Sequence, residues 1–267
     1  MTRAVGRAQG VFAQLTESLL GAAVDLSDLD LTRHPPELVA EARGVWEGRF
    51  RSEFRSMQIM ARFVTEVLGA GDPLEVWGCA ADLVQDEVRH ARLCVALCEA
   101  LGARPHLPEP VVLRDPEPFL RAPMAERALH TAITMLAINE TISVAYIEDL
   151  RARCPEPAVR RVLDQTLADE EGHQAFGWEY VARSLQRFPA STRPEWRSLV
   201  AATLLPHEEA AARDLAAIPE SARHLSAHPD HHCVGLGLFS APRQALVFQQ
   251  VMTQTLAPRL AALELWP

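Results

Sequence analysis

Apolar residues recur along most of this chain every three or four positions, the spacing that places side chains on one face of an α-helix. The pattern predicts one short amphipathic helix, then four long helices, then a later pair. The predicted helices cover about residues 8–24, 37–69, 73–101, 124–153, 156–187, 192–216 and 241–263. Glycine and proline interrupt the pattern between them, as expected where helices end, and bends are expected at Pro206 and Pro258.

Two of the long helices carry charged residues on their apolar faces. The face of 37–69 holds Trp46, Phe50, Glu53, Met57 and Val64. The face of 73–101 holds Cys79, Leu83, Glu87, His90, Cys94 and Leu97. A carboxylate on an otherwise apolar face is costly unless something compensates its charge. These positions are therefore candidates for chemistry.

The order of the helices predicts the fold class. Six prolines lie in 103–123, a connection long enough to carry the chain along a bundle. A helix pair before it and a helix pair after it form a degenerate internal repeat. We expect an all-α protein with a four-helix bundle and a long crossover. The whole chain, 1–267, is expected to be one domain, with the core at about 37–187 and accessory helices at about 8–24, 192–216 and 241–263.

Composition narrows the class of protein. A hydrophobic content of 48% is ample for a core, and an aromatic content of 6% fits a helical bias. The net charge of −9 argues against nucleic-acid binding. No apolar run reaches the roughly 18 residues of a membrane span, and the first 25 residues lack a signal-peptide layout. The five cysteines are odd in number and favour reduced thiols. We therefore expect a cytoplasmic protein.

One short motif appears twice. "QDEVRHARLC" contains Asp86, Glu87 and His90, and "LADEEGHQAFGW" contains Asp169, Glu170 and His173. Each copy follows a lone glutamate on an apolar stretch, and these glutamates are Glu53 and Glu140. The separations are 34 residues from Glu53 to Glu87 and 30 from Glu140 to Glu170. Each fits one helical hairpin.

The residue types suit a pair of divalent metal ions. Residues three apart on a helix share a face, so the Glu and His of each motif can grip one ion. Four glutamates balance the charge of two divalent cations in a dry core. Carboxylates and imidazoles together suit iron or manganese. The alternative is a solvated helical charge pattern with core histidines.

At these residues the chain resembles the ferritin-like superfamily of di-iron carboxylate proteins, over roughly 37–187. The resemblance implies a ferritin-like bundle. It implies as metal ligands and catalytic residues Glu53, Glu87, His90, Glu140, Glu170 and His173. It further implies that Asp86 and Asp169 accept the remaining imidazole N–H groups, each from the histidine of the other copy. The alternative for each aspartate is a charge that faces solvent.

Within that superfamily the chain departs from several patterns. Cys94 stands where a radical-storing tyrosine would lie, so we expect no stable tyrosyl radical. Val144 stands where hydroxylases carry a threonine, with Thr141 as the nearest hydroxyl. The rubredoxin module of rubrerythrins is absent. The substrate pocket is expected beside the first and third long helices, near Phe50, Phe54, Met57, Cys94 and Val144.

The function implied is that of a non-haem di-iron oxidoreductase or oxygenase. Two iron ions, or one manganese and one iron, would use O2 as co-substrate to oxidise a small organic molecule. The partners expected are that substrate, an electron donor such as a ferredoxin or reductase, and a second copy in a homodimer, with no nucleic acid or membrane. A ferroxidase, iron-storage or peroxide-scavenging protein is one alternative. A non-catalytic interaction protein is another.

Other polar clusters are assigned less specific roles. Cys94 and Cys98 are expected to pack in the core. The segment with His224, His228, His231 and His232 matches no common zinc spacing and is expected to be a solvent loop. His207, with Glu208 and Glu209, is expected at the surface rather than as a cap over the site.

Overall fold

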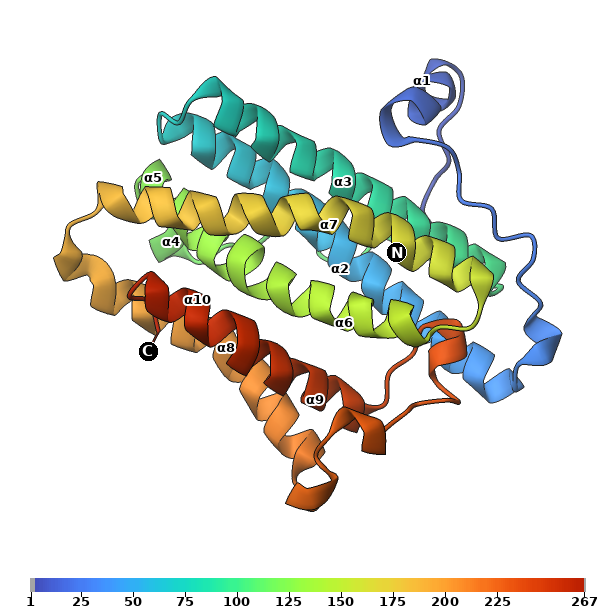
Figure 1. Ribbon diagram of the computed structural model, residues 1–267. Helices are drawn as coiled ribbons and strands as arrows, with labels where there is room; N and C mark the ends of the chain where they lie inside the picture. Colours follow the sequence, from blue (N-terminus) through green and yellow to red (C-terminus); the bar gives the residue numbers. More distant parts are fainter. Residues whose placement is uncertain (1–2, 267) are drawn as a thin grey trace. The chain divides into compact units, whose positions relative to one another are not determined.

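The structure is a computed structural model that describes residues 3–266 (Figure 1). Within that range the chain is helical and has no β-strand, and Ala4 and His106 form an isolated bridge. The all-α prediction is therefore confirmed. The principal helices are α1 (Val11–Leu20), α2 (Pro36–Gly69), α3 (Leu74–Ala100), α4 (Glu117–Arg121), α5 (Met124–Thr131), α6 (Glu140–Arg153), α7 (Pro157–Ser184), α8 (Arg193–Leu215), α9 (Ala241–Val251) and α10 (Ala257–Ala262).

Two segments wind as π-helices. η2 (Ala132–Asn139) joins α5 to α6, and η8 (Met252–Leu256) joins α9 to α10. The predicted helix at 124–153 is therefore continuous but underwound in its middle, by the wider turn of i→i+5 hydrogen bonds. The predicted helix at 8–24 is shorter than expected, because Gly10 and Gly21 flank α1 with positive φ angles of 59° and 75°.

The contacts within the chain divide it into two compact units. Unit 1 comprises Met1–Arg127 and Cys154–Thr166, and unit 2 comprises Ala128–Arg153 and Leu167–Pro267. The long helix α7 contributes its first part to unit 1 and the rest to unit 2. The expectation of a single domain stays a prediction.

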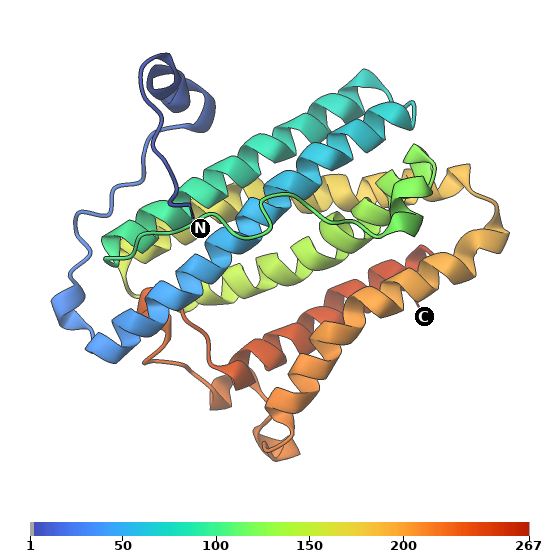
Figure 2. The same cartoon turned by 180° about the vertical axis from the view of Figure 1, so that it is seen from behind.

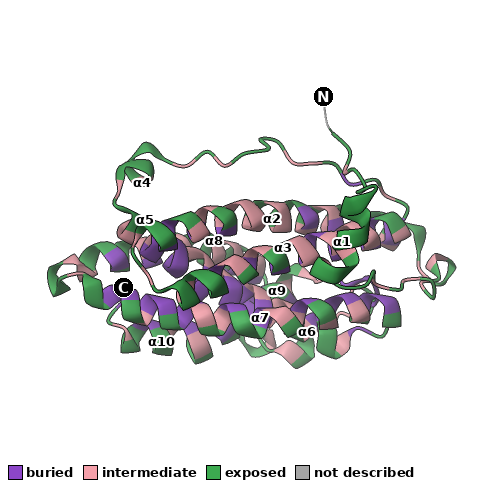
Figure 3. Ribbon diagram, turned by 90° about the horizontal axis from the view of Figure 1, so that it is seen from above, coloured by how far each residue is buried: buried purple, intermediate pink, exposed green. Residues whose placement is uncertain are grey.

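Unit 1 is organised around the hairpin of α2 and α3, which lie side by side (Figure 1). Helix α1 contacts α3 but has no buried residue, and Figure 3 shows it as exposed. The crossover between α3 and α4 runs back along α2 (Figure 2). Cys79, which we expected on the inner face of its helix, is exposed. It lies in the first turns of α3, where the side chains before Ala80 are exposed or half-buried.

A buried carboxylate anchors the end of the crossover. Glu66 on α2 is fully buried, and its Oε1 lies 3.1 Å from Arg62 Nε and 3.2 Å from Arg127 Nη2. Both guanidinium groups also lie over the ring of Phe119 on α4, at 4.5 and 5.0 Å. Arg62 further pairs with Asp115 in the crossover. Because a buried charge is tolerated only when it is paired, this cluster fixes α4 and α5 against α2.

Unit 2 is organised around α6, α8 and α9, with α9 in contact with both of the others. Gly177 on α7 closely approaches η2: a Cβ atom there would lie 2.6 Å from the Leu136 Cβ and 2.8 Å from its carbonyl carbon. Only glycine permits this contact without a shift. The α7 backbone is thereby held against the π-helix.

Another arginine, Arg243, fixes the segment between α8 and α9. Arg243 Nε donates to Asp149 Oδ2 on α6 at 2.8 Å. Its Nη1 donates to the carbonyl oxygens of Leu225 at 2.9 Å and His228 at 2.7 Å. Burial raises the pKa of Asp149, but hydrogen bonds from Arg243 and Arg153 outweigh it, so the pKa lies below its usual value. This cluster ties the segment to α6 and α9.

In the described part of the chain, no helix has the length and apolar character needed to cross a membrane.

Candidate metal centre

The first ligand group lies in unit 1, on the hairpin of α2 and α3. Glu53, Glu87 and His90 each place one ligand atom so that all three atoms lie within 4.8 Å of one another. Glu87 and His90 are buried at 2% and 1% exposure, and the Glu53 side chain is 22% exposed. His90 Nδ1 lies 3.9 Å from Glu53 Oε2. This group can hold a metal ion.

The helical register explains why these three residues meet. Glu87 and His90 are three positions apart on α3 and share a face. Glu53 lies on the face of α2 that also carries the buried Trp46 and Phe50. Two carboxylates and one neutral imidazole would balance one divalent cation, and oxygen and imidazole nitrogen are the donors that iron and manganese accept.

A basic residue beside this group was not expected from the sequence. Arg49 lies one turn before Glu53 on α2 and stacks on the Trp46 ring, with its guanidinium carbon 4.2 Å from the ring centre. Burial lowers the pKa of Arg49, while the negative charge of the Glu53 carboxylate acts in the opposite direction. Arg49 therefore supplies positive charge where a cation would bind.

Cys94 is buried one turn after His90. Burial raises the pKa of its thiol well above the usual value, and the Glu53 carboxylate adds to the effect. The thiol therefore stays protonated near neutral pH, and a protonated thiol is a poor metal ligand. Cys98 is also buried, in agreement with its predicted packing role.

The second ligand group lies in unit 2. His173 Nδ1 is 3.3 Å from Glu170 Oε2, three positions earlier on α7. A carboxylate oxygen of Glu140 and a ring nitrogen of His173 lie within 4.8 Å of each other. All three residues are buried, at 7% exposure or less. His173 therefore lies close to two buried carboxylates of unit 2, those of Glu140 and Glu170.

The electrostatics of the second group favour positive charge. Burial lowers the pKa of His173, but the hydrogen bond from its ring to Glu170 and the charges of Glu170, Glu140 and Asp169 outweigh burial and raise it. Carboxylates that hold a proton on the imidazole can hold a divalent cation once that proton leaves. The donor set therefore fits a metal ion in this unit too.

The π-helix η2 ends at Asn139, directly before Glu140. The side-chain amide of Asn139 forms hydrogen bonds through both its nitrogen and its oxygen. Asn139 Nδ2 donates to the Thr134 carbonyl at 2.8 Å, so its Oδ1 is the acceptor for His207 Nε2 at 3.0 Å. His207, from α8, stacks on Phe248 with ring centres 5.8 Å apart. Isolated π turns often occur at functional sites. Here the turn sets the position from which Glu140 projects.

His207 was predicted at the surface, and that prediction is wrong for its side chain. The ring is half-buried and bonded to Asn139, and burial lowers its pKa. Its neighbours Glu208 and Glu209 are exposed as predicted. The sequence did not indicate the contact because the Asn139 partner lies in a π segment, where helical phase is shifted by one residue.

The two aspartates differ in environment. Asp86 is buried and forms an ion pair with Arg89, one turn later on α3. Asp169 is half-buried on α7, and its charge raises the pKa of His173. Neither aspartate faces solvent fully, as the alternative interpretation from the sequence would have required. The prediction that each accepts the imidazole N–H of the other copy's histidine stays a prediction.

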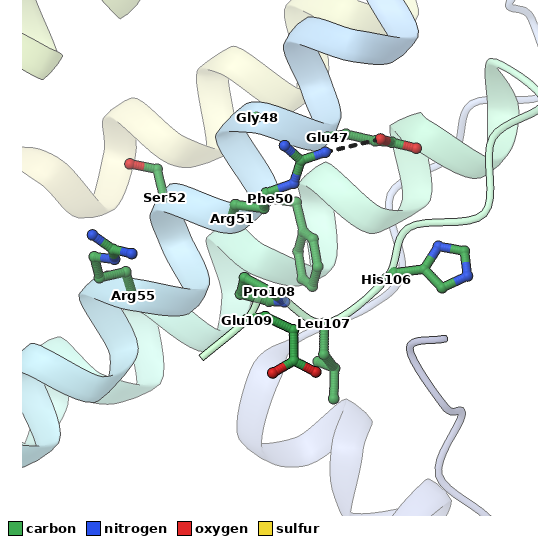
Figure 4. Close-up of a pocket in the computed structure, with 10 residues that line it drawn as sticks. All are labelled: Glu47, Gly48, Phe50, Arg51, Ser52, Arg55, His106, Leu107, Pro108 and Glu109. Carbon is green, nitrogen blue, oxygen red and sulfur yellow. Dashed lines mark hydrogen bonds and ion pairs between the residues drawn. The ribbon is translucent and has the colours of Figure 1, made fainter. Parts of the chain in front are cut away.

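The predicted pocket residues are distributed over different surroundings. Phe50 lines a cleft of about 640 Å³ between α2 and residues 106–109 of the crossover, where Arg51 pairs with Glu47 (Figure 4). Phe54 and Met57 are half-buried on α2. Val144 lines a separate cavity in unit 2.

The histidine-rich segment provides no metal site in the described structure. Within residues 3–266, none of the residue groups close enough to hold an ion includes a histidine of the segment between α8 and α9. His224, His231 and His232 are exposed, and His228 is half-buried.

Comparison of the chain with known protein families, with curated proteins and with solved structures gave no match. The two glutamate and histidine groups are therefore the features of the chain that bear on its function.

Proposed function

We propose that the two ligand groups together form a carboxylate-bridged dinuclear iron site, and that the protein is an O2-dependent oxidoreductase of the ferritin-like superfamily. One observation carries the proposal: the histidine of each Asp-Glu-x-x-His motif lies close to the lone upstream glutamate, His90 to Glu53 in unit 1 and His173 to Glu140 in unit 2. That the groups share one pair of ions is inferred from the repeat and its ligand chemistry.

Charge balance supports iron or manganese over a metal-free role. Glu53 and Glu87 carry two negative charges, and Glu140 and Glu170 carry two more. Burial of such groups without cations is costly. A divalent ion in each group removes the imbalance, and the oxygen-rich donor set favours hard or borderline metals over soft ones.

When bound, the iron pair would supply the electrons that reduce O2 and thereby permit oxidation of an organic substrate. The chain's own residues have separate tasks. The four glutamates and two histidines hold the ions. Asp169 favours positive charge at His173, and Arg49 limits the net charge beside Glu53. Because the Cys94 thiol is protonated, the anionic ligand that α3 contributes is Glu87.

Metal analysis with Mössbauer and EPR spectroscopy tests the proposal on full-length protein loaded with Fe(II) and exposed to air. We expect about two iron ions per chain in a spin-coupled pair, which is silent in conventional EPR. Two separate high-spin ferric signals would contradict a shared site. Less than half an equivalent of iron, with no Fe(II) uptake, would contradict any iron site.

Substitutions test the ligand assignment. Glu87→Ala and Glu170→Ala each remove one carboxylate from a charge-balanced group, so iron content should fall sharply. Glu171→Ala is the matched control, because Glu171 is the exposed neighbour of Glu170 on α7. Unchanged iron content in both ligand variants would refute the assignment.

Iron turnover with accumulation of ferric mineral and no organic product would instead favour storage.

A further inference from the structure

A cavity of about 390 Å³ lies in unit 2 between α6, α7 and the helix formed by α9 and η8. Pockets that bind small molecules range from about 300 to 1,000 Å³. Its α6 wall includes Thr141, which directly follows the ligand Glu140. Its α7 wall includes Gln174, which directly follows the ligand His173. The cavity is thus built from the same helical turns as the unit 2 ligand group.

The lining separates into an apolar floor and a polar rim. Val144, Val247 and Val251 line the cavity and are buried. Glu148 and Gln254 line it and are exposed. A ligand that matches both parts has a short apolar body and a polar end.

The π-helix η8 shapes one side of the cavity. Gln254 and Thr255 lie within η8 and line the cavity directly. A π turn inserts an extra residue and shifts the register of the side chains that follow. With Gln174 and Gln250, the amide of Gln254 gives the lining several donors and acceptors that can bind hydroxyl, amino or carbonyl groups.

The charge of the lining has one sign. Its charged residues are Glu148 and Asp149, and it includes no lysine, arginine or histidine. The Asp149 carboxylate is held by Arg243 and Arg153. Within residues 3–266, the Glu148 carboxylate forms no ion pair. The carboxylate whose charge stays available to a ligand is therefore that of Glu148.

We propose that this cavity binds a small organic amine in its ammonium form. The ammonium group pairs with Glu148, the glutamine amides bind further polar atoms, and the apolar body rests on the valine floor. The inference rests on the proposed function, since it names the substrate class of that oxidoreductase as amines. Binding itself requires no metal and can be measured separately.

The test uses three probes of equal chain length on full-length protein near neutral pH: n-butylamine, butanoate and n-butanol. Saturation-transfer NMR and titration calorimetry measure their binding. We expect the amine to bind about tenfold more tightly than either of the others, the size of effect typical of one charge-assisted hydrogen bond. Equal binding of all three, or preference for butanoate, would overturn the proposal.

Glu148→Gln removes the charge and keeps the shape of an exposed residue. We expect it to abolish the preference for butylamine over butanol. The matched control is Glu209→Gln, an exposed glutamate of the same unit that does not line the cavity. Retention of the preference in Glu148→Gln, or its loss in Glu209→Gln, would contradict the assignment.

The location of binding can be read from one indole group. Trp178 Nε1 donates to Thr141 Oγ1 at 3.1 Å, and Thr141 lines the cavity. The ¹⁵N indole resonance of Trp178, which the Trp178→Phe variant identifies by its absence, should therefore shift when butylamine binds. Amine binding that leaves this resonance unmoved would place the site elsewhere.

Normal iron loading without amine preference refutes only this inference, whereas amine preference without iron uptake refutes only the proposed metal site.

Discussion

Arg49 places a positive charge beside the ligand group of unit 1. Its guanidinium is held on the Trp46 ring and interacts with the charge of Glu53. In the absence of a metal ion this charge stabilises the carboxylates, and in its presence it opposes the ion. Arg49 therefore lowers the cost of the empty site and the affinity of the filled one.

Replacement of this charge should strengthen metal binding. We predict that Arg49→Gln binds Fe(II), or Co(II) as a spectroscopic probe, about three- to tenfold more tightly, the scale of one partly screened charge. Competition with a chelator measures the affinity. Arg51→Gln is the control, because Arg51 is exposed on the same helix and pairs with Glu47. Weaker binding by Arg49→Gln would mean that Arg49 positions Glu53 instead.

His207 gives the protein a stability that depends on pH. Because burial lowers its pKa, the folded state favours the neutral ring. The resulting stability is present above the unfolded-state pKa of about 6.5 and is lost as the pH falls through the lower folded-state value. Its Nε2 donates to Asn139 Oδ1 throughout.

We predict that His207→Gln, which keeps an N–H donor for Asn139, loses less stability than the wild type between about pH 7 and pH 5. Urea unfolding at several pH values measures the difference. His231→Gln, an exposed histidine of the same unit, should follow the wild-type curve. Identical pH dependence in His207→Gln and wild type would show that this ring is not a source of the acid sensitivity.

At the scale of elements, the contact between α7 and η2 decides how closely the two can pack. A Cβ atom at Gly177 would meet both the side chain and the backbone of Leu136. Backbone atoms cannot move aside as a flexible side chain can. The two elements must therefore separate if any other residue replaces this glycine.

We predict that Gly177→Ala lowers the free energy of unfolding by about 1–3 kcal/mol, as overpacked sites do. Gly172 lies on the same helix, and a Cβ atom there would meet nothing within 4 Å. Gly172→Ala should therefore raise the free energy of unfolding by about 0.5–1 kcal/mol through helix propensity alone. Chemical denaturation of both variants checks the pair. A neutral Gly177→Ala would show that α7 and η2 can separate without cost.

The sequence predicts the straight helices, and the proximity of Glu53, Glu87 and His90, for a physical reason. A carboxylate such as Glu53 is conspicuous on an apolar helical face. The three-residue spacing of Glu87 and His90 predicts that their side chains share a face of the helix. The π segments are not visible in the same way, because the apolar pattern keeps its ordinary helical spacing on each side of the inserted residue. Asn139 and His207 therefore appeared unrelated. Arg49 was not distinguished from the other arginines, since its role depends on the position of an aromatic ring.

At the scale of the whole molecule, a shared pair of ions would couple the stability of the two units. An ion that binds the folded state stabilises it by RT ln(1 + [L]/Kd), or about 4 kcal/mol at a thousandfold excess over Kd. If Glu87 and Glu170 bind the same pair, neither unit can open locally without loss of that free energy.

We predict that Fe(II) added without oxygen increases hydrogen-exchange protection of residues 80–97 and 164–181 together. The Glu87→Ala variant should lose the effect in both segments. Mass spectrometry of exchanged peptides measures each segment separately. Protection of only one segment by metal, or loss confined to the mutated unit, would indicate two independent ion sites.

The arginine that ties the segment between α8 and α9 determines which substitutions the segment can accept. Arg243 binds the carbonyl oxygens of Leu225 and His228 together with Asp149, and these attachments depend on backbone atoms and one carboxylate. The exposed side chains of His231 and His232 take no part in them. Replacement of either histidine therefore leaves the attachment of the segment intact, whereas loss of Asp149 leaves the buried guanidinium of Arg243 without its carboxylate partner.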